Sequence, residues 1–328
     1  MGEIKKILIT GGGGYVGSVL VPKLIKNGFF VNVIDLMIYG ETLPRDKNLK
    51  IFKGDIRDID LVKKSLEGVD AVIHLACISN DPSFELDKKL GKSINLDSFR
   101  PLLEQSIISR VKRFIYASSS SVYGIKKEKN VNEEMSLEPL TDYSKFKADC
   151  EKILSEYKEK NFCQTVIRPA TVCGYSPRQR LDLVVNILTN LAFHNRKISI
   201  FGGNQLRPNI HINDMTELYI SLLNCNDKII NRNIFNAGYE NNSVSELGNI
   251  VKNKVGDDVE IIKTETDDNR SYHISSEKIK KDLNFSPKHT IDDAVQDLLN
   301  AFKNKLLNDP LNNEYYFNIK RMNSLKLK

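Results

Sequence analysis

The sequence is short of the features that mark disulfide-bonded, zinc-binding and membrane-spanning proteins. Its five cysteines include no pair in C-x-x-C spacing, and most lie within apolar patterns, which argues against structural disulfides and metal sites. No apolar run reaches the roughly 20 residues that a membrane-spanning helix needs, and the first apolar segment is not preceded by a signal peptide pattern. We therefore expect a cytoplasmic protein in a reducing compartment, with no metal and no membrane partner.

The body of the chain also has little net positive charge. The net charge is +6 over 328 residues, but the last eleven residues, 318–328, carry four basic residues and no acid. The remainder therefore carries only +2, and we do not expect nucleic acid as a partner. With 41% hydrophobic residues and no repeats or low-complexity linkers, the chain can bury one large core or two closely joined ones.

The first distinctive stretch is TGGGGYVG, residues 10–17, which follows an apolar strand pattern over 5–10 and opens a helical pattern over 15–27. In this context Gly11 allows a tight turn, Gly14 lets the backbone approach a pyrophosphate, and Gly17 permits close helix packing. The free N–H groups at the start of the helix, around Tyr15 and Val16, attract phosphate. The stretch predicts a dinucleotide site.

Asp35 ends the second strand pattern, over 31–35, eighteen residues after Gly17. A carboxylate in this place can accept hydrogen bonds from the adenosine ribose and repels a 2′-phosphate. No Lys or Arg follows before Arg45. These features predict NAD, rather than NADP, as the cofactor.

Further apolar strand patterns alternate with helical patterns and long connections, which predicts a doubly wound parallel sheet of the Rossmann type with a smaller, mixed C-terminal substrate-binding domain. The third to sixth strands are expected at 49–54, 71–76, 111–118 and 165–168, with one long helix over 86–109. His74 lies inside the fourth strand and is interpreted as a packed core residue.

We expect two units and a tail. The segment 234–237 is apolar enough to rejoin the main sheet. Ser243 and Glu246 form a capping box that opens one helix, and Thr290, supported by Asp293, opens another. The predicted NAD-binding unit comprises residues 1–170 with 210–238, the sugar-nucleotide unit comprises 171–209 with 239–308, and 309–328 form a basic, polar and peripheral tail.

The stretch 140–160 reads as one amphipathic helix, in which Tyr143 and Lys147 lie four residues apart on the same face. An ammonium near a phenol lowers the pKa of the phenol, so this pair can supply a general base. The same Y-x-x-x-K spacing occurs at Tyr123/Lys127 and Tyr316/Lys320. Only Tyr143 opens a long helix after a serine-rich strand end, so we favour it over the other two.

TGxxGxxG, Asp35, the GDIRD segment at 54–58, SSSSVYG at 118–124 and YxxxK occur in this order. The set resembles the extended short-chain dehydrogenase/reductase family, in its NAD-dependent nucleotide-sugar epimerase/dehydratase branch, over roughly residues 5–305. The resemblance implies that Tyr143 takes a proton from a sugar hydroxyl, that Lys147 holds the nicotinamide ribose, and that Ser119 hydrogen-bonds the reacting oxygen.

The resemblance also implies binding residues. For the cofactor they are Gly11, Gly14, Tyr15, Val16, Gly17, Asp35, Asp55, Ile56, Leu75, Ala76, Cys77, Asn95, Tyr143 and Lys147. For the substrate they are Ser119, Ser120, Thr171, Arg207 and Arg270, the two arginines on the diphosphate, which their planar fork suits.

The sequence departs from the family pattern at several places. Dehydratases of the branch have Asp-Glu after the Ser/Thr, where this chain has Ser120 and Ser121, and serines are poor proton donors and acceptors for an elimination. Thr171 stands where Asn is frequent, Tyr175 where Pro is frequent, and Pro208 where Asp often follows the phosphate arginine. These departures concern the substrate pocket and argue against 4,6-dehydration.

The favoured hypothesis is an enzyme of carbohydrate biosynthesis that transfers hydride at C4 of a nucleotide-activated sugar and acts as a 4-epimerase. A 4-dehydrogenase or 4-keto reductase would use the same residues. A non-catalytic dinucleotide sensor is a remote third reading, because it has no need of the Tyr/Lys/Ser set. The 86–109 and 140–160 helices resemble the family's pairing surface, which predicts a homodimer. The sequence identifies neither the base nor the sugar.

Overall fold

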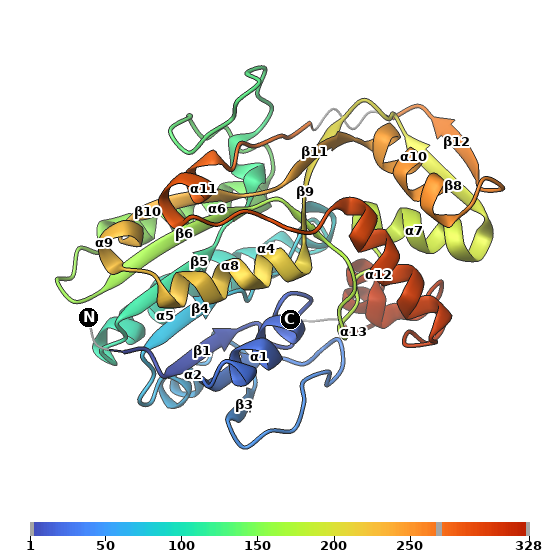
Figure 1. Cartoon of the computed structure of the whole chain (residues 1–328). Coiled ribbons are helices and arrows are strands. Elements are labelled where there is room, and N and C mark those ends of the chain that lie inside the picture. The colour runs from blue at the N-terminus through green and yellow to red at the C-terminus, as the bar shows by residue number, and fades with distance from the viewer. Residues whose placement is uncertain (1–2, 267–270, 326–328) are drawn as a thin grey trace.

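Seven parallel strands form the main sheet, in the order β10-β6-β5-β4-β1-β2-β3 (Figure 1). The computed structural model describes residues 3–266 and 271–325. The strand order reverses between β1 and β4, so a crevice forms there beyond the carboxyl ends of the strands. The strands are β1 (Lys6–Thr10), β2 (Phe30–Asp35), β3 (Leu49–Lys53), β4 (Ala71–His74), β5 (Arg113–Ala117), β6 (Cys163–Pro169) and β10 (Asn233–Ala237). The predicted doubly wound sheet is confirmed.

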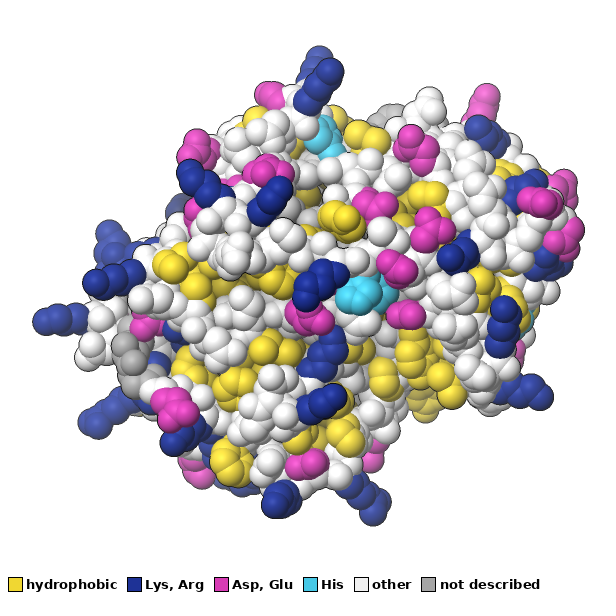
Figure 2. Space-filling model, viewed as in Figure 1, with side chains coloured by type: hydrophobic (Ala, Val, Ile, Leu, Met, Phe, Trp, Pro, Cys, Tyr) yellow, Lys and Arg dark blue, Asp and Glu magenta, His cyan; other side chains and the backbone are white. Residues whose placement is uncertain are grey.

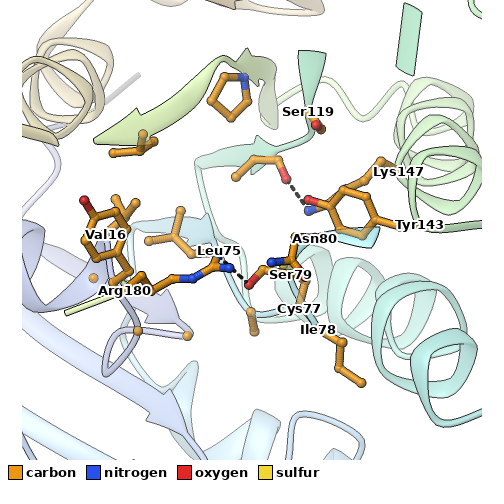
Figure 3. Close-up of a pocket in the computed structure, with 18 of the residues that line it drawn as sticks. Val16, Leu75, Cys77, Ile78, Ser79, Asn80, Ser119, Tyr143, Lys147 and Arg180 are labelled. Atoms are coloured by element: carbon orange, nitrogen blue, oxygen red, sulfur yellow. Dashed lines mark hydrogen bonds between the residues drawn. The ribbon is translucent and has the colours of Figure 1, made fainter. Parts of the chain in front are cut away.

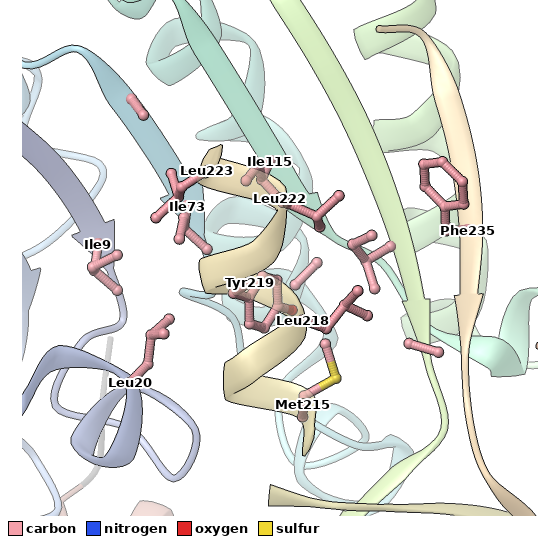
Figure 4. Packing of buried hydrophobic residues seen from close by; sticks show 14 of the residues in the cluster. Ile9, Leu20, Ile73, Ile115, Met215, Leu218, Tyr219, Leu222, Leu223 and Phe235 are labelled. Carbon is pink, nitrogen blue, oxygen red and sulfur yellow. The ribbon is translucent and has the colours of Figure 1, made fainter. Parts of the chain in front are cut away.

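Alternate residues of the strands feed two separate cores, as the period of two along a strand requires. Ile7 and Ile9 of β1 pack with the helices on one face, whereas Leu8 packs with those on the other. Figure 4 shows the first of these cores, in which Leu218 and Leu222 of α8 (Ile212–Asn224) lie against the sheet. Because both faces are buried, the inner strands β1, β4 and β5 are nearly continuous apolar runs, whereas the edge strand β3 is partly exposed.

Helices cover both faces of the main sheet. α1 (Gly17–Lys26) packs beside α8 on one face, and α2 (Ile59–Ser65), α5 (Phe99–Ile108) and α6 (Asp142–Glu156) lie together on the other. His74 is packed among aromatic rings in the second core, its Nδ1 2.7 Å from the Thr10 hydroxyl, and burial lowers its pKa to about 3. It is a core histidine, as predicted.

A smaller part of the molecule, on the right in Figure 1, is built from two short sheets and three helices around a third core. The predicted capping box at Ser243 opens α10, and Thr290, predicted to open a helix, forms a second capping box at the start of α12. The elements are β7 (Thr171–Cys173), β8 (Lys197–Phe201), β9 (Leu206–His211), β11 (Glu240–Ser243), β12 (Glu260–Thr264), α7 (Val184–Asn195), α10 (Val244–Val255) and α12 (Ile291–Lys303). The predicted domain boundaries are compatible with this arrangement and stay a prediction.

The expected single helix over 86–109 is wrong. The segment divides into α4 (Lys88–Lys92), a π-helical turn η1 (Ser93–Asp97) and α5, after a short α3 (Asp81–Phe84). Pro101 has no N–H to donate to the carbonyl of Asp97, so the regular hydrogen-bond ladder cannot cross this point. Three more short helical elements are η2 (Ser120–Tyr123), α9 (Asp227–Ile230) and α11 (Glu277–Leu283).

The C-terminal segment is not the peripheral tail that its composition suggests. After η3 (Glu314–Tyr316), the helix α13 (Asn318–Leu325) docks over the carboxyl end of the main sheet. Asn318 is 2% exposed, and Met322 packs among Ile78, Phe84 and Ile94. A polar composition did not reveal this contact because only two residues of the helix are buried.

The outer surface carries charge of both signs. Figure 2 shows Lys and Arg side chains scattered around the rim of one face, with Asp and Glu side chains between them. Within residues 3–266 and 271–325, no helix combines the length and the hydropathy that crossing a membrane requires.

The helix α6 is fixed by a buried ion pair beneath its first turns. Glu151 lies on its inner face and binds Arg168 of β6, with Oε2 2.6 Å from the guanidinium, and both side chains are buried. Arg168 also donates to the hydroxyl of Tyr123, at 2.7 Å, and that hydroxyl donates to Asn236 of β10 at 2.7 Å. The network joins the strands β6 and β10, the 3-10 helix η2 and α6.

Removing one member of this pair should destabilise the protein more than removing both. Glu151→Met leaves the Arg168 cation buried and unpaired, so the free energy of unfolding should fall by about 3–5 kcal/mol. The double variant Glu151→Met/Arg168→Met should recover at least half of that loss in urea denaturation. A double variant no more stable than Glu151→Met would contradict the account.

Candidate active site

The glycine turn after β1 is packed so closely against the backbone that Gly11 and Gly17 leave no room for a side chain. Gly11 has φ of +73°, and a Cβ built on it would lie 2.7 Å from the backbone nitrogen of Ala76. A Cβ on Gly17 would meet the backbone of Gly12 at 2.4 Å. The helix α1 that follows has no side-chain cap and no acid in its first turn. Its N–H groups and positive dipole end are therefore open to an anion.

Asp35 joins the end of β2 to the glycine turn. Its Oδ2 accepts from the Gly13 N–H at 2.9 Å, and its Oδ1 accepts from the Met37 N–H at 2.7 Å. Burial raises the pKa of Asp35, while these two N–H groups act in the opposite direction. The carboxylate therefore has a fixed orientation at the place predicted for a ribose.

Tyr143 and Lys147 project from α6 toward the carboxyl end of β5 (Figure 3). Thr141 caps the helix through a capping box with Ser144, which fixes the start of its first turn. Lys147 is 5% exposed, and its ammonium donates to the Ala117 carbonyl oxygen at 2.7 Å. Tyr143 and Lys147 thus share one face of the helix, as predicted.

The predicted effect of Lys147 on the phenol is not what the structure gives. Burial raises the pKa of Tyr143 well above its ordinary value of about 10, and the nearby charge of Asp81 adds to the rise. Arg180 and a hydrogen bond with Ser119 act in the opposite direction without outweighing burial. The Lys147 ammonium, bound to a backbone carbonyl and 5.9 Å from the centre of the Tyr143 ring, does not reverse this balance.

The serine cluster lies where β5 ends. Ser119 caps the 3-10 helix η2, and its Oγ is 2.8 Å from the Oγ of Ser121. Ser118 also lines the cavity, but its hydroxyl donates to Glu151. The backbone therefore directs Ser119, and not Ser118, toward Tyr143.

Most of the predicted site residues line one cavity of about 450 Å³ at the carboxyl end of the main sheet. Arg207 lies in its wall near the ring of Tyr272. The cavity brings together Gly11, Gly14, Tyr15, Val16, Gly17, Asp35, Asp55, Ile56, Leu75, Ala76, Cys77, Ser119, Ser120, Tyr143, Lys147, Thr171 and Arg207.

Two predicted residues are placed otherwise. Asn95 does not line the cavity: its amide accepts from the Ile78 N–H at 2.8 Å and donates to the Ile78 carbonyl at 3.0 Å. It shapes the loop after β4 from behind, and its predicted contact with the cofactor stays a prediction. Arg270 lies outside the described residues.

Sequence reasoning missed the buried arginines of the segment 174–182. Arg178 and Arg180 both line the cavity, and Figure 3 shows Arg180 between Val16 and the loop after β4. Arg180 pairs with Asp182 at 2.9 Å and donates to Ser79 at 3.1 Å. The available signal was two arginines in a short turn, SPRQR, directly before an apolar helix.

The alternative Tyr/Lys pairs have structural tasks. The Tyr123 hydroxyl accepts a hydrogen bond from Arg168 and donates one to Asn236. The Tyr316 hydroxyl accepts from the Asn308 N–H at 3.1 Å. Neither residue lines the cavity.

A model of the NAD dependent epimerase/dehydratase family matches residues 7–238. The uncharacterised protein y4nG of Sinorhizobium fredii is 33% identical over 67% of this chain and 54% of its own length. A UDP-glucose 4-epimerase of Lactobacillus helveticus is 29% identical over 88% of this chain and 94% of its own. A dTDP-D-glucose 4,6-dehydratase of Dictyostelium discoideum is 31% identical over 67% of this chain and 56% of its own. The chain thus spans little more than half of two of these relatives.

Among solved structures, the UDP-glucose 4-epimerase of Thermotoga maritima with UDP-glucose superposes with a TM-score of 0.84 and 25% identity. The match covers 92% of this chain and 100% of that one. The similarity therefore extends over both the main sheet and the smaller part.

The raised pKa of Tyr143 predicts a simple titration. Without cofactor or substrate, the phenol should stay protonated up to at least pH 10, because burial disfavours the phenolate. The ultraviolet absorbance of phenolate, compared between the unmodified protein and Tyr143→Phe, should then show no additional ionisation below that pH. A phenolate that titrates near pH 7 and is lost in Tyr143→Phe would contradict this reading.

Proposed function

Since the chain belongs to the NAD-dependent epimerase/dehydratase family, with NAD as its cofactor, we propose that it is a nucleotide-sugar 4-epimerase. The observation that carries the proposal is the convergence of Tyr143, Lys147 and Ser119 on one cavity with the glycine turn. The predicted resemblance to the extended short-chain dehydrogenases/reductases is confirmed, and a non-catalytic dinucleotide sensor has no use for these three residues.

The cavity residues fit the dinucleotide. The uncapped start of α1 suits a diphosphate, and the fixed carboxylate of Asp35 suits ribose hydroxyls. Bound NAD would accept a hydride from the sugar and return it. The Lys147 ammonium has three N–H donors and gives one to the Ala117 carbonyl, so a second could bind a ribose hydroxyl.

The protein's own part in the reaction is proton handling. Tyr143 would take the proton of the 4-hydroxyl while Ser119 holds the same oxygen. Because burial keeps the phenol protonated in the free protein, the base must form after ligands bind, when a cationic nicotinamide ring and Lys147 favour the phenolate. Thr171, Ser120 and Arg207 are proposed substrate contacts, with Arg207 and Arg270 on the diphosphate.

Epimerisation is favoured over dehydration by the residues beside Ser119. Ser120 and Ser121 line the cavity where dehydratases of the branch carry an acid pair. The carboxylate that acts on the pKa of Tyr143 is that of Asp81. Its Oδ1 accepts a hydrogen bond from the hydroxyl of Thr141 at the start of α6. A 4-dehydrogenase or 4-keto reductase remains the alternative, since release of the ketone needs the same residues.

A homodimer and a cytoplasmic location stay part of the proposal. The outer faces of α5 and α6, which we expect to pair, carry a cluster in which Arg100 binds Glu156 at 2.9 Å and Tyr157 accepts from Arg100 at 3.0 Å. The side chains of Arg100 and Glu156 are exposed and available to a second copy, whereas Tyr157 is half-buried.

The experiment starts from a panel of UDP-, dTDP- and GDP-sugars screened by thermal shift, where a ligand at 100 times its Kd stabilises by roughly 2.7 kcal/mol. With the sugar so identified, Tyr143→Phe should keep its affinity and lose about 100-fold or more in kcat, as expected for a general base. Tyr316→Phe is the matched control, because its hydroxyl lies outside the cavity. Equal loss in the control, or a 4-keto-6-deoxy product from the unmodified enzyme, would contradict the proposal.

A further inference from the structure

Arg178 is buried beside the cofactor cavity without an acidic partner. It is 3% exposed, and no carboxylate in residues 3–266 and 271–325 lies within salt-bridge distance of its guanidinium. One terminal nitrogen donates to Oδ1 of Asn318 at 2.6 Å, the other reaches the Gln179 carbonyl only at 3.4 Å, and Nε has no hydrogen-bond partner in that part of the chain. Its guanidinium carbon lies 3.6 Å from the centre of the Tyr39 ring.

The other buried arginines differ in this respect. Arg168 pairs with Glu151, Arg180 with Asp182, and Arg113 with Asp227. A buried cation without a counterion is costly, and proteins retain one mainly where a ligand supplies the missing charge. Burial and the neighbouring Arg180 lower the pKa of Arg178 to about 10, while the charges of Asp182 and Asp35 act in the opposite direction, so it is still charged at neutral pH. With no carboxylate of the described residues within salt-bridge distance, the side chain is suited to bind an anion.

The position of Arg178 identifies the anion. Its segment is tied to the glycine turn, since Ser176 donates to the Tyr15 carbonyl at 2.7 Å and the Tyr15 hydroxyl donates to the Gly174 carbonyl at 2.7 Å. Arg178 lines the cavity together with Tyr15 and Asp35, and its charge acts on both. Arg178 thus lies near the anion-binding start of α1 and near the carboxylate that suits the adenosine ribose. In a dinucleotide, the diphosphate is bonded directly to that ribose.

We propose that Arg178 binds the diphosphate of the dinucleotide and that Asn318, from the C-terminal helix α13, positions it. Asn318 is itself held, because its backbone N–H donates to Asp182 at 3.0 Å and its amide donates to Ser79 at 3.1 Å. The C-terminal helix α13 then contributes to cofactor binding through Asn318. The inference rests on the cofactor alone and holds for an epimerase or a dehydrogenase.

The test measures binding by calorimetry with the full-length protein freed of nucleotide. Arg178→Met should weaken NAD+ and ADP-ribose by about 10- to 100-fold, the range for a charge-assisted hydrogen bond, and should leave adenosine, which has no phosphate, unchanged. The melting temperature of the ligand-free variant should be equal or higher, because an unpaired buried charge has been removed. Arg178→Lys keeps the charge but not the planar fork, so its affinity for NAD+ should lie between those of the unmodified protein and Arg178→Met.

Asn318→Asp gives an independent reading if Arg178→Met does not fold. The new carboxylate would neutralise Arg178 internally and compete with the diphosphate, so NAD+ should bind more weakly than to Asn318→Ala. Arg196→Met, at an exposed pair with Asp258 far from the cavity, is the control and should bind NAD+ normally. Unchanged NAD+ affinity in the Arg178 variants, equal weakening of adenosine, or a loss confined to NADP+ would overturn the proposal.

Discussion

The buried pair of Glu151 and Arg168 is the interaction on which the site depends. Tyr143, Lys147 and Glu151 follow one another at intervals of four residues, so they share one face of α6. Anchoring Glu151 to β6 and to Ser118 at the end of β5 sets the rotation of the helix. That rotation directs Lys147 to the Ala117 carbonyl and Tyr143 into the cavity, with the cost of burying charge met by a complete set of partners.

The chemistry of Tyr143 follows from its burial more than from its neighbour. Because burial raises its pKa, the Tyr143 phenol keeps its proton in the ligand-free protein and is not a base there. The uncapped start of α1 and the buried guanidinium of Arg178 contribute positive charge to the same cavity. These features suit an anionic ligand.

The sheet, the glycine turn, Asp35 and the Tyr143–Lys147 helix could be predicted because each has a local signature in period, spacing or capping. Four features could not. Pro101 breaks a helix through a missing donor that apolar periodicity does not weigh. Asn95 lies in the π-helical turn η1, and its amide binds the backbone of Ile78 and does not line the cavity. Arg178 and Asn318 meet across 140 residues of sequence. The polar tail docks through Asn318 and Met322, the buried residues of α13, and through Arg321, which donates to the Ile38 carbonyl, and no composition average reveals these contacts.

The central claim is that hydride leaves C4 of the sugar and returns to it on the same protein molecule, with Tyr143 moving the proton. The most direct measurement is mass spectrometry of the product formed from a nucleotide sugar deuterated at C4, with NAD present only in the amount of the enzyme. The account predicts the C4 epimer with the deuterium still at C4 and free NADH without label. A ketone that has lost the deuterium, with the label on free NADH, or a product that has lost water, would contradict it.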